Sequence, residues 1–291
     1  MAIPGTRGMS LKELGIRLYH LSFDHAILDR AAQLSYYFVF ALFPLLAFGV
    51  TLSAYIPIGN LLSALMERAA YVMPESAWKI LEAQQNSLLH QPKPKLLTVE
   101  FLVAIWSASR GVDAIRSALN LAYDVKETRS YWKIQAIALL MTLAGSILIL
   151  LGFSLIFFGG KAGYWLAGEV GMSHPFLIAW AWLRWPITAL LIMLTLALFY
   201  DLLPDVQPRF RFVTPGAVVS TSAWLVATWA FTQYVGHFGN YDATYGAIGG
   251  IIILLTWFYI SGLLFVLGGE INAVIDQHST ERSSTAPPAA A

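Results

Sequence analysis

The sequence predicts an all-α integral membrane protein, a bundle of about six transmembrane helices with amphipathic interfacial helices. Apolar residues make up 57% of the 291 residues and charged residues 12%, against roughly 25% charged residues in an average soluble domain. The apolar residues also come in runs near the length of a membrane span, separated by short polar stretches. Lipid is therefore the expected surrounding of most of the chain.

Residues 1–32 are expected to hold a cytoplasmic interfacial helix. Between residues 10 and 30, leucines recur at helical spacing while the charged residues turn to another face. These leucines are Leu11, Leu14, Leu18, Leu21 and Leu28. Charged residues interrupt the apolar positions of this stretch, so a cleavable signal is not expected and the first span serves as the insertion signal.

The first span is expected at residues 33–56, an uncharged stretch long enough to cross about 30 Å of hydrocarbon at about 1.5 Å per residue. Pro44 lies in its middle, removes one backbone donor and is expected to kink the helix. Residues 57–95 are more polar, with apolar positions at three- and four-residue spacing. They predict an amphipathic helix against the outer surface.

The second span, expected at residues 97–119, carries the main conflict in the sequence. Its apolar stretch is too short to cross a bilayer and runs into Arg110, Asp113 and Arg116. Either this segment is re-entrant, or the helix continues and carries charge into the membrane. The continuous helix is preferred, because residues 97–122 contain no proline and one glycine, and Arg110 and Asp113 can neutralise each other at i,i+3.

Four further spans complete a transmembrane domain over residues 33–272. They are expected at residues 134–158, 176–200, 213–236 and 246–269, each a long apolar run. The predicted connectors are Gly159-Gly160-Lys161, Pro204 with Pro208, and residues 236–245. Residues 277–291, rich in serine, proline and alanine, have no means of burying a core and are expected to form a disordered cytoplasmic tail.

Orientation follows from the basic residues. They precede the first span and lie between the second and third spans and between the fourth and fifth. Examples are Arg17, Arg116, Arg129 and Arg209, whereas the last loop of the opposite side has no basic residue. By the positive-inside rule, both termini are expected to be cytoplasmic.

Composition also limits partners and cofactors. The net charge of +1 gives no reason to expect a nucleic acid partner, and membrane lipids are the expected one. The chain has no cysteine, which excludes disulfides and thiolate metal sites. Its six histidines are scattered over different segments and both predicted sides. We therefore expect no metal site and no cofactor.

The strongest candidate ligand-binding group is Arg110, Asp113, Arg116, Asn120 and Tyr123. Charges at membrane depth are costly and normally face a bundle interior or a wet cavity. A guanidinium there suits a phosphate or carboxylate head group. In the alternative interpretation the helix leaves the membrane at Arg110, and these residues fix the topology. The sequence leaves both open.

Other polar positions are weaker candidates. Tyr241, Asp242 and Tyr245 lie in the last outer connection, where a short polar turn requires such residues in any case. Glu270 follows the last span and is interpreted as a tether to a neighbouring basic loop, with a proton carrier as the alternative. Arg184 lies among tryptophans, which indicates an interfacial side chain that reaches the head groups.

Small and kinking residues indicate helix packing or a moving element. These are Pro44, Gly216, Gly246, Gly249 and Gly250. Small side chains let membrane helices approach closely.

Several patches in order make the chain resemble the BrkB/YihY family of bacterial inner-membrane proteins. They are AQLSYYFVFALFPLL around Pro44, WSASRGVDAIRSALNLAYDV from Trp106, FYDLLPDV ending at Val206, TPGAVVSTSAW from Thr214, YDATYGAIGG from Tyr241, and the closing WFYISGLLFVLGGEINA. The resemblance implies a six-span α-helical protein of the bacterial cytoplasmic membrane. The family has been linked to serum resistance and to lipid or lipopolysaccharide export, and it carries an older ribonuclease label.

Two functional hypotheses follow. The leading one is a transporter or flippase for an anionic amphiphile such as a lipid or lipid-linked glycan. The sequence contains no GxxxxGK[ST] loop, so transport would be passive, gradient-coupled or partner-driven. The alternative is a structural membrane protein of the cell envelope that assembles with a second copy or an envelope partner. Ribonuclease activity is rejected as the main activity, because no histidine and carboxylate cluster is visible.

Overall fold

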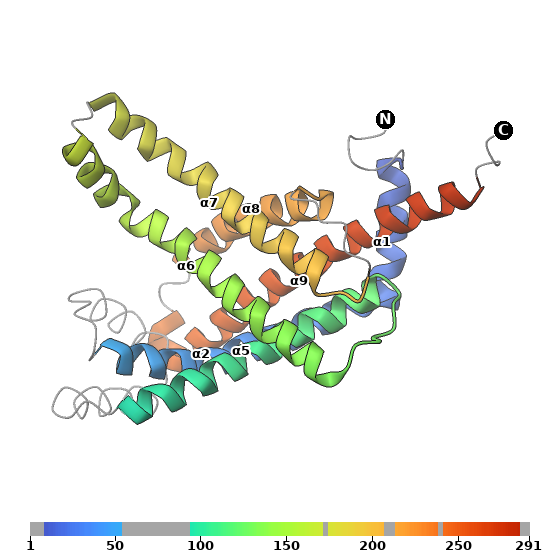
Figure 1. Ribbon diagram of the computed structural model, residues 1–291, viewed down its shortest axis with the longest axis horizontal. Helices are drawn as coiled ribbons and strands as arrows, with labels where there is room; N and C mark the ends of the chain where they lie inside the picture. The colour runs from blue at the N-terminus through green and yellow to red at the C-terminus, as the bar shows by residue number, and fades with distance from the viewer. Residues whose placement is uncertain (1–8, 54–93, 171–173, 207–212, 238–240, 286–291) are drawn as a thin grey trace. The chain divides into compact units, whose positions relative to one another are not determined.

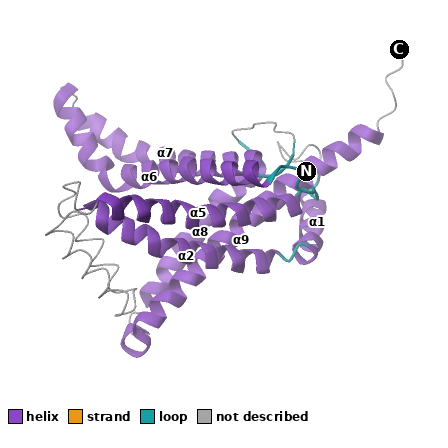
Figure 2. Ribbon diagram, turned by 60° about the horizontal axis from the view of Figure 1, so that its bottom comes forward, coloured by secondary structure: helices purple, strands orange, loops and turns teal. Residues whose placement is uncertain are grey.

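The computed structural model describes residues 9–53, 94–170, 174–206, 213–237 and 241–285 (Figure 1). These residues form seven helices and no strand (Figure 2), which confirms the all-α fold class. The helices are α1 (Leu11–Asp24), α2 (Ile27–Ser53), α5 (Pro94–Ala122), α6 (Tyr131–Val170), α7 (His174–Leu202), α8 (Pro215–His237) and α9 (Tyr241–Thr285). The amphipathic helix expected within residues 57–95 lies outside the described residues, except at its end.

Four helices are long and apolar enough to cross a membrane. The qualifying stretches, in the part of the chain described, are Ile27–Gly49, Tyr131–Ile156, Phe176–Leu202 and Gly249–Ser279. They correspond to the first, third, fourth and sixth expected spans. α5 carries charged residues along its length, and α8 is diluted by Ser, Thr, Trp and Gln. The count of six spans therefore stays a prediction.

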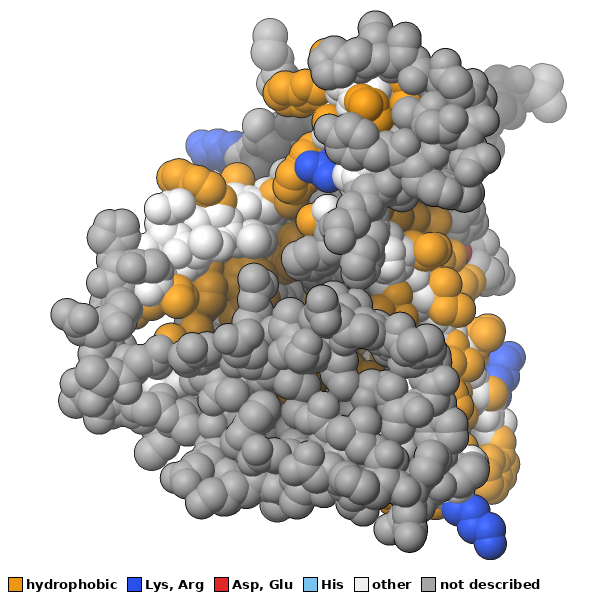
Figure 3. Space-filling model, turned by 90° about the vertical axis from the view of Figure 1, so that its left-hand side faces the viewer, with side chains coloured by type: hydrophobic (Ala, Val, Ile, Leu, Met, Phe, Trp, Pro, Cys, Tyr) orange, Lys and Arg blue, Asp and Glu red, His pale blue; other side chains and the backbone are white. Residues whose placement is uncertain are grey.

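The surface of the described helices fits lipid surroundings. Large hydrophobic side chains lie exposed on several of them, and Figure 3 shows hydrophobic side chains over much of the described surface of one face. Trp132, Trp182 and Trp229 are 79%, 76% and 67% exposed. An apolar exterior of this kind is expected where the solvent is lipid.

The expected N-terminal helix is interrupted, which corrects the prediction of one helix over residues 10–30. Ser10 caps α1 by accepting a hydrogen bond from the Glu13 amide at 3.2 Å. At the other end, Ala26 adopts a φ of 47°. This left-handed backbone ends the helical hydrogen-bond pattern at His25. α2 then begins at Ile27 and runs through Pro44 to Ser53 without a break.

α6 and α7 lie side by side (Figures 1 and 2) and are longer than expected. α6 continues through Gly159 and Gly160, where a connector was predicted. These glycines are contact points, because the Trp180 indole donates to the Gly159 carbonyl at 2.5 Å and the Arg184 side chain lies beside both glycines. Closer to the start of α6, a Cβ on Gly145 would lie 3.0 Å from the Phe199 ring. Packing therefore explains why the glycines do not end the helix.

α9 is longer than its expected span at both ends. It begins at Tyr241, so part of the predicted outer connection is helical, and it runs to Thr285. The prediction of disorder from residue 277 is therefore wrong up to Thr285. Within that stretch, Ser279 donates to the Asp276 carbonyl at 2.7 Å, and His278 Nδ1 lies 4.0 Å from a Glu13 oxygen. One local contact and one contact with α1 thus accompany the continued helix.

The chain divides into two compact units. Unit 1 comprises Met1–Ala26, Arg116–Ala223 and Phe265–Ala291, and unit 2 comprises Ile27–Ile115 and Trp224–Leu264. Within unit 2, aromatic rings on different helices pack against each other. The ring centroids of Trp224 and Trp257 are 5.7 Å apart, and those of Phe38 and Phe258 are 5.5 Å apart. The ion pairs described below lie in unit 1, which therefore holds the candidate site.

Candidate functional site

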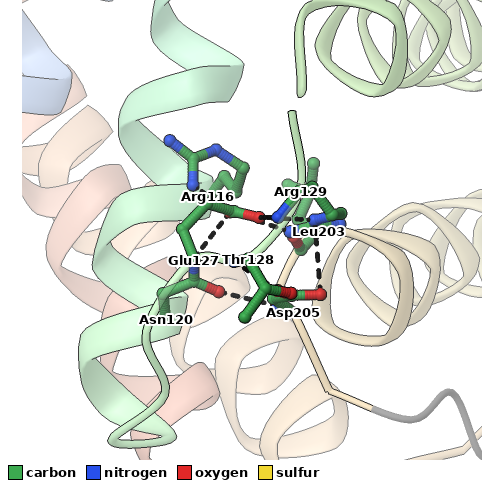
Figure 4. Close-up of polar contacts among 7 residues, drawn as sticks. All are labelled: Arg116, Asn120, Glu127, Thr128, Arg129, Leu203 and Asp205. Atoms are coloured by element: carbon green, nitrogen blue, oxygen red, sulfur yellow. Dashed lines mark hydrogen bonds and ion pairs between the residues drawn. The ribbon is translucent and has the colours of Figure 1, made fainter. Parts of the chain in front are cut away.

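A polar network joins three stretches of unit 1 (Figure 4). It combines the end of α5, the loop between α5 and α6, and the residues at the end of α7. Its members, named here the loop network, are Arg116, Asn120, Glu127, Thr128, Arg129, Leu203 and Asp205. Tyr131 and Trp132 follow directly on α6, 63% and 79% exposed. Because such aromatic residues collect at membrane interfaces, the loop network is expected at a membrane surface.

Glu127 is the centre of the loop network. Its carboxylate accepts hydrogen bonds from Arg116 Nη1, from Asn120 Nδ2 at 2.9 Å and from Arg129 Nε at 2.7 Å. Burial raises the pKa of this carboxyl, but the hydrogen bonds from Arg129 and Asn120 outweigh burial and lower the pKa to about 2. Glu127 is therefore ionised at neutral pH.

Asp205, which follows α7, is the second carboxylate of the loop network. It accepts from the Thr128 amide at 2.8 Å and from the Thr128 hydroxyl at 2.6 Å, and it lies 3.5 Å from Arg129 Nε. The Thr128 hydroxyl and amide lower the pKa of this carboxyl. Arg129 also donates to the Leu203 carbonyl at 2.7 Å. The network thus ties the α5–α6 loop to the end of α7.

The charges of the loop network balance each other. Two guanidinium groups, of Arg116 and Arg129, face two carboxylates, of Glu127 and Asp205. The arginine side chains are 12% and 9% exposed. An arginine already paired in this way must exchange its partner before it binds a phosphate or carboxylate head group. In this arrangement the network acts first as a clamp between loops.

The candidate group on α5 is not gathered into one site. The helix is continuous from Pro94 to Ala122, as preferred from the sequence. Arg110 and Asp113 belong to unit 2, where the described contact of the Arg110 guanidinium is with the Trp106 ring, 5.9 Å away. Arg116 and Asn120 belong to unit 1 and meet at Glu127.

Tyr123, the last member of that group, also belongs to unit 1. It does not join the loop network in the described contacts. Burial raises the pKa of its phenol, and the negative charges of Asp276 and Asp201 add to the rise. This links Tyr123 to α7 and α9 through charge and gives it no described hydrogen bond to a network residue.

Glu270 forms a second polar site in unit 1. Its side chain is 1% exposed and lies within the candidate span Gly249–Ser279. Oε1 lies 2.7 Å from Nδ1 of His25, whose side chain is 14% exposed. Oε2 is buried with no hydrogen-bond partner among the described residues. His25, in the turn after α1, is thus the described partner of Glu270, and whether Glu270 is a tether or a proton carrier stays a prediction.

Closely packed glycines surround Glu270. A Cβ on Gly216 of α8 would overlap the Gly268 carbonyl oxygen, and one on Gly269 would overlap the Leu119 side chain. Asn272 fastens the same crossing, since its Oδ1 accepts from the Gly216 amide at 2.8 Å. Gly216, predicted as a packing glycine, therefore lies where α8 and α9 touch through their backbones.

The remaining predicted positions are less informative. Tyr241, Asp242 and Tyr245 lie in the first turns of α9, and their side chains are outside the described residues. Gly246 lies on the same helix, and Gly249 and Gly250 are buried. Among the residues described, no group of three or more His, Cys, Asp or Glu could hold a metal ion.

Sequence reasoning missed Glu127, Thr128, Asp205 and His25. The sequence predicts Arg116 as a ligand-binding or topology residue and Arg129 as a topology residue, without an acidic partner for either. Glu127, two residues from Arg129, is a signal that the sequence does contain. The contact between His25 and Glu270 joins residues 245 apart and leaves no local signal.

Comparisons with known proteins agree with this architecture. The profile of the family described as "Virulence factor BrkB" matches residues 20–291. A relative from Bacillus subtilis (strain 168), named putative ribonuclease-like protein YfkH, is 40% identical over 91% of this chain and 94% of its own length. A UPF0761 membrane protein from Stenotrophomonas maltophilia (strain R551-3) is 24% identical over 88% of this chain. One from Xanthomonas oryzae pv. oryzae (strain PXO99A) is 26% identical over 87%.

The chain matches 59% and 58% of the lengths of the Stenotrophomonas and Xanthomonas proteins. No solved structure matches the chain.

Proposed function

Since the chain is a membrane protein that belongs to the virulence factor BrkB family, we propose that it transports or flips an anionic amphiphile such as a lipid or lipid-linked glycan. We place it in the bacterial cytoplasmic (inner) membrane as a multi-pass protein with both termini cytoplasmic. The sequence contains no ATP-binding GxxxxGK[ST] loop, so the transport is passive, gradient-coupled or driven by a partner.

The observation that carries the proposal is the buried His25–Glu270 pair. Glu270 is 1% exposed inside a candidate span, and ionisable side chains in such positions mark substrate, ion or proton pathways by default. A protein that only fills the membrane would avoid the cost of burying this group. The two arginines of the loop network suit an anionic head group only once they exchange their carboxylate partners, so the choice of an anionic substrate is part of the proposal.

The test is a flip assay with the purified full chain in liposomes that contain fluorescent phosphatidylglycerol. A membrane-impermeant reductant bleaches the outer leaflet, so bleaching beyond the outer-leaflet fraction reports flipping. We expect flipping by the wild-type chain and a loss of at least about tenfold in the Glu270→Gln variant. Asp29→Asn, which changes an exposed carboxylate on α2, is the matched control and retains the wild-type rate. Equal rates in protein-free liposomes and in liposomes with the wild-type chain contradict the proposal.

The second candidate function is a structural protein of the cell envelope. The specific observation in its favour is that the arginines of the loop network are already paired with Glu127 and Asp205. Such a clamp needs no substrate. Under this function the chain shows no flipping but is recovered from native membranes in a stable complex with a second copy or an envelope protein.

Ribonuclease activity, suggested by the name of the Bacillus relative, is not part of the proposal. Metal-dependent cleavage of RNA needs clustered histidine and carboxylate ligands. Two of the histidines, His25 and His278, lie instead next to Glu270 and Glu13. Metal-dependent cleavage of RNA by the purified chain, lost on a point substitution, would contradict this choice.

A further inference from the structure

We propose that the His25–Glu270 pair is a proton-binding site, which takes up one proton along the Nδ1···Oε1 contact and supplies the coupling ion for transport. The coupling part rests on the proposed function, whereas the proton site itself stands on the geometry of the pair. The two parts are tested separately below.

The two carboxyl oxygens of Glu270 have unequal surroundings. Oε1 has His25 at 2.7 Å, but Oε2 is buried without a hydrogen-bond partner in the described part of the chain. An ionised carboxylate in that position leaves charge on an oxygen that nothing solvates, which is costly. In the protonated acid, Oε2 is a neutral carbonyl oxygen, and leaving it unpartnered costs less. The site is therefore built to hold a proton.

Among the described residues, Glu270 has no cationic neighbour besides His25. Tyr200 of α7 lies against Gly268 and Gly269, and the start of α8 contributes Gly216 and Ser220, neither of which ionises. Tyr123 interacts through charge with Tyr200, Asp201 and Asp276. Among the described groups, His25 is the charged partner of Glu270. Tyr200 donates its hydroxyl to the Phe265 carbonyl at 2.7 Å. No Lys or Arg contact with Glu270 is present among the described contacts, so a proton or His25 must offset its charge.

The exposures of the two side chains give the proton a route. The His25 side chain is 14% exposed and that of Glu270 is 1% exposed, so the imidazole is the more accessible group. In the unprotonated state, neutral His25 donates Nδ1–H to the Glu270 carboxylate. A proton that arrives at Nε2 makes the imidazolium, and the Nδ1 proton then passes to Oε1. The result is a neutral acid and a neutral imidazole protonated at Nε2, with one proton gained and one negative charge removed.

The position of the pair connects its charge to helix packing. Glu270 follows Gly268 and Gly269, the glycines at which α9 touches α8 and Leu119 of α5. A change of charge at Glu270 therefore occurs next to the point where the backbones of α8 and α9 touch directly. The two helices are tightly packed there, because an added Cβ would overlap its neighbours.

The decisive experiment is infrared difference spectroscopy of the full chain in nanodiscs, recorded as the pH is changed. We expect a carboxylic acid carbonyl band that titrates, is absent from Glu270→Gln and moves in frequency in Glu270→Asp. The His25→Asn variant keeps the band and shifts its midpoint by about one pH unit or more, because it changes the group next to Oε1. Asp29→Asn leaves the band unchanged. A band absent from the wild-type chain, or kept in Glu270→Gln, overturns the proton site.

The coupling is then read in the flip assay with and without a pH gradient. A rate that rises with the gradient in the wild-type chain and is insensitive to it in Glu270→Gln supports the coupling. A titrating band without flipping overturns the proposed function and leaves the proton site intact. Flipping without the band overturns the proton site and leaves the function intact. Since Glu270→Asp keeps a carboxyl, it decides the matter if Glu270→Gln does not fold.

Discussion

The backbone amide of Asp205 donates a hydrogen bond of 2.8 Å to the side-chain oxygen of Asn120, a residue 85 positions earlier in the chain. The amide nitrogen of the same Asn120 side chain donates to Glu127 at 2.9 Å. One buried side chain, 6% exposed, thus bridges two loops of unit 1 with both its polar atoms. The folding of unit 1 is expected to depend on it.

Replacing this side chain tests that dependence. Asn120→Ala removes both hydrogen bonds and leaves the Asp205 amide and Glu127 short of a partner, at a cost of about 1–3 kcal/mol. We expect a lower midpoint of thermal unfolding for the purified chain, followed by tryptophan fluorescence. Lys126→Ala, which alters an exposed residue of the same loop, is the control and should unfold like the wild-type chain. Equal midpoints for the two variants would show that the bridge contributes nothing.

Acid should weaken the loop network. The pKa of Glu127 is about 2 in the folded chain and 4.5 without the folded surroundings. The contribution of Glu127 to stability is therefore complete above pH 4.5. That contribution is lost as the pH falls from 4.5 to about 2, and Asp205, whose pKa is also lowered, acts in the same direction. Unfolding midpoints measured across this window should fall more steeply for the wild-type chain than for Glu127→Gln. Parallel curves would contradict the assignment.

The backbone contact between α8 and α9 predicts a sharp difference between two glycines. Gly216→Ala places a Cβ against the Gly268 carbonyl and the Asn272 side chain, so we expect loss of folded protein, seen as aggregation in detergent by size-exclusion chromatography. Gly15 of α1 has nothing within 4 Å of its added Cβ. Gly15→Ala is the matched control and should stabilise α1 slightly, by about 0.5–1 kcal/mol. Normal folding of Gly216→Ala would show that the helices can separate there without cost.

The sequence predicts the fold class because long apolar runs leave few alternatives, and the structure confirms it. The ends of the helices are harder. Gly159 and Gly160 read as a connector, yet packing against Trp180 and Arg184 keeps α6 helical. Conversely, the break at Ala26 depends on a left-handed φ of 47° that alanine does not signal. Tertiary contacts override local propensity in both cases.

The site is predicted less completely for a related reason. The sequence predicts Arg116, Asn120 and Glu270 because charged or polar groups near membrane spans are unusual. Of their partners, Glu127 lies 7 residues from Asn120 and 11 from Arg116, whereas Asp205 is 85 residues from Asn120 and His25 is 245 from Glu270. Periodicity and composition describe one segment at a time and carry no information about such pairs. The charge balance of the loop network is visible only once its loops are brought together.

The loop network also predicts the side of the membrane on which it lies. The α5–α6 loop and the end of α7 are joined by Thr128 and Asp205, so they share one side. The basic residues around them predict that this side is cytoplasmic. The native chain has no cysteine, which makes single-cysteine labelling clean. In spheroplasts, we expect Lys126→Cys to react with an impermeant maleimide only after permeabilisation. Ser173→Cys, between the third and fourth expected spans, should react without it. Labelling of Lys126→Cys in intact spheroplasts would reverse the orientation and place the loop network, and with it the two arginines, at the outer surface.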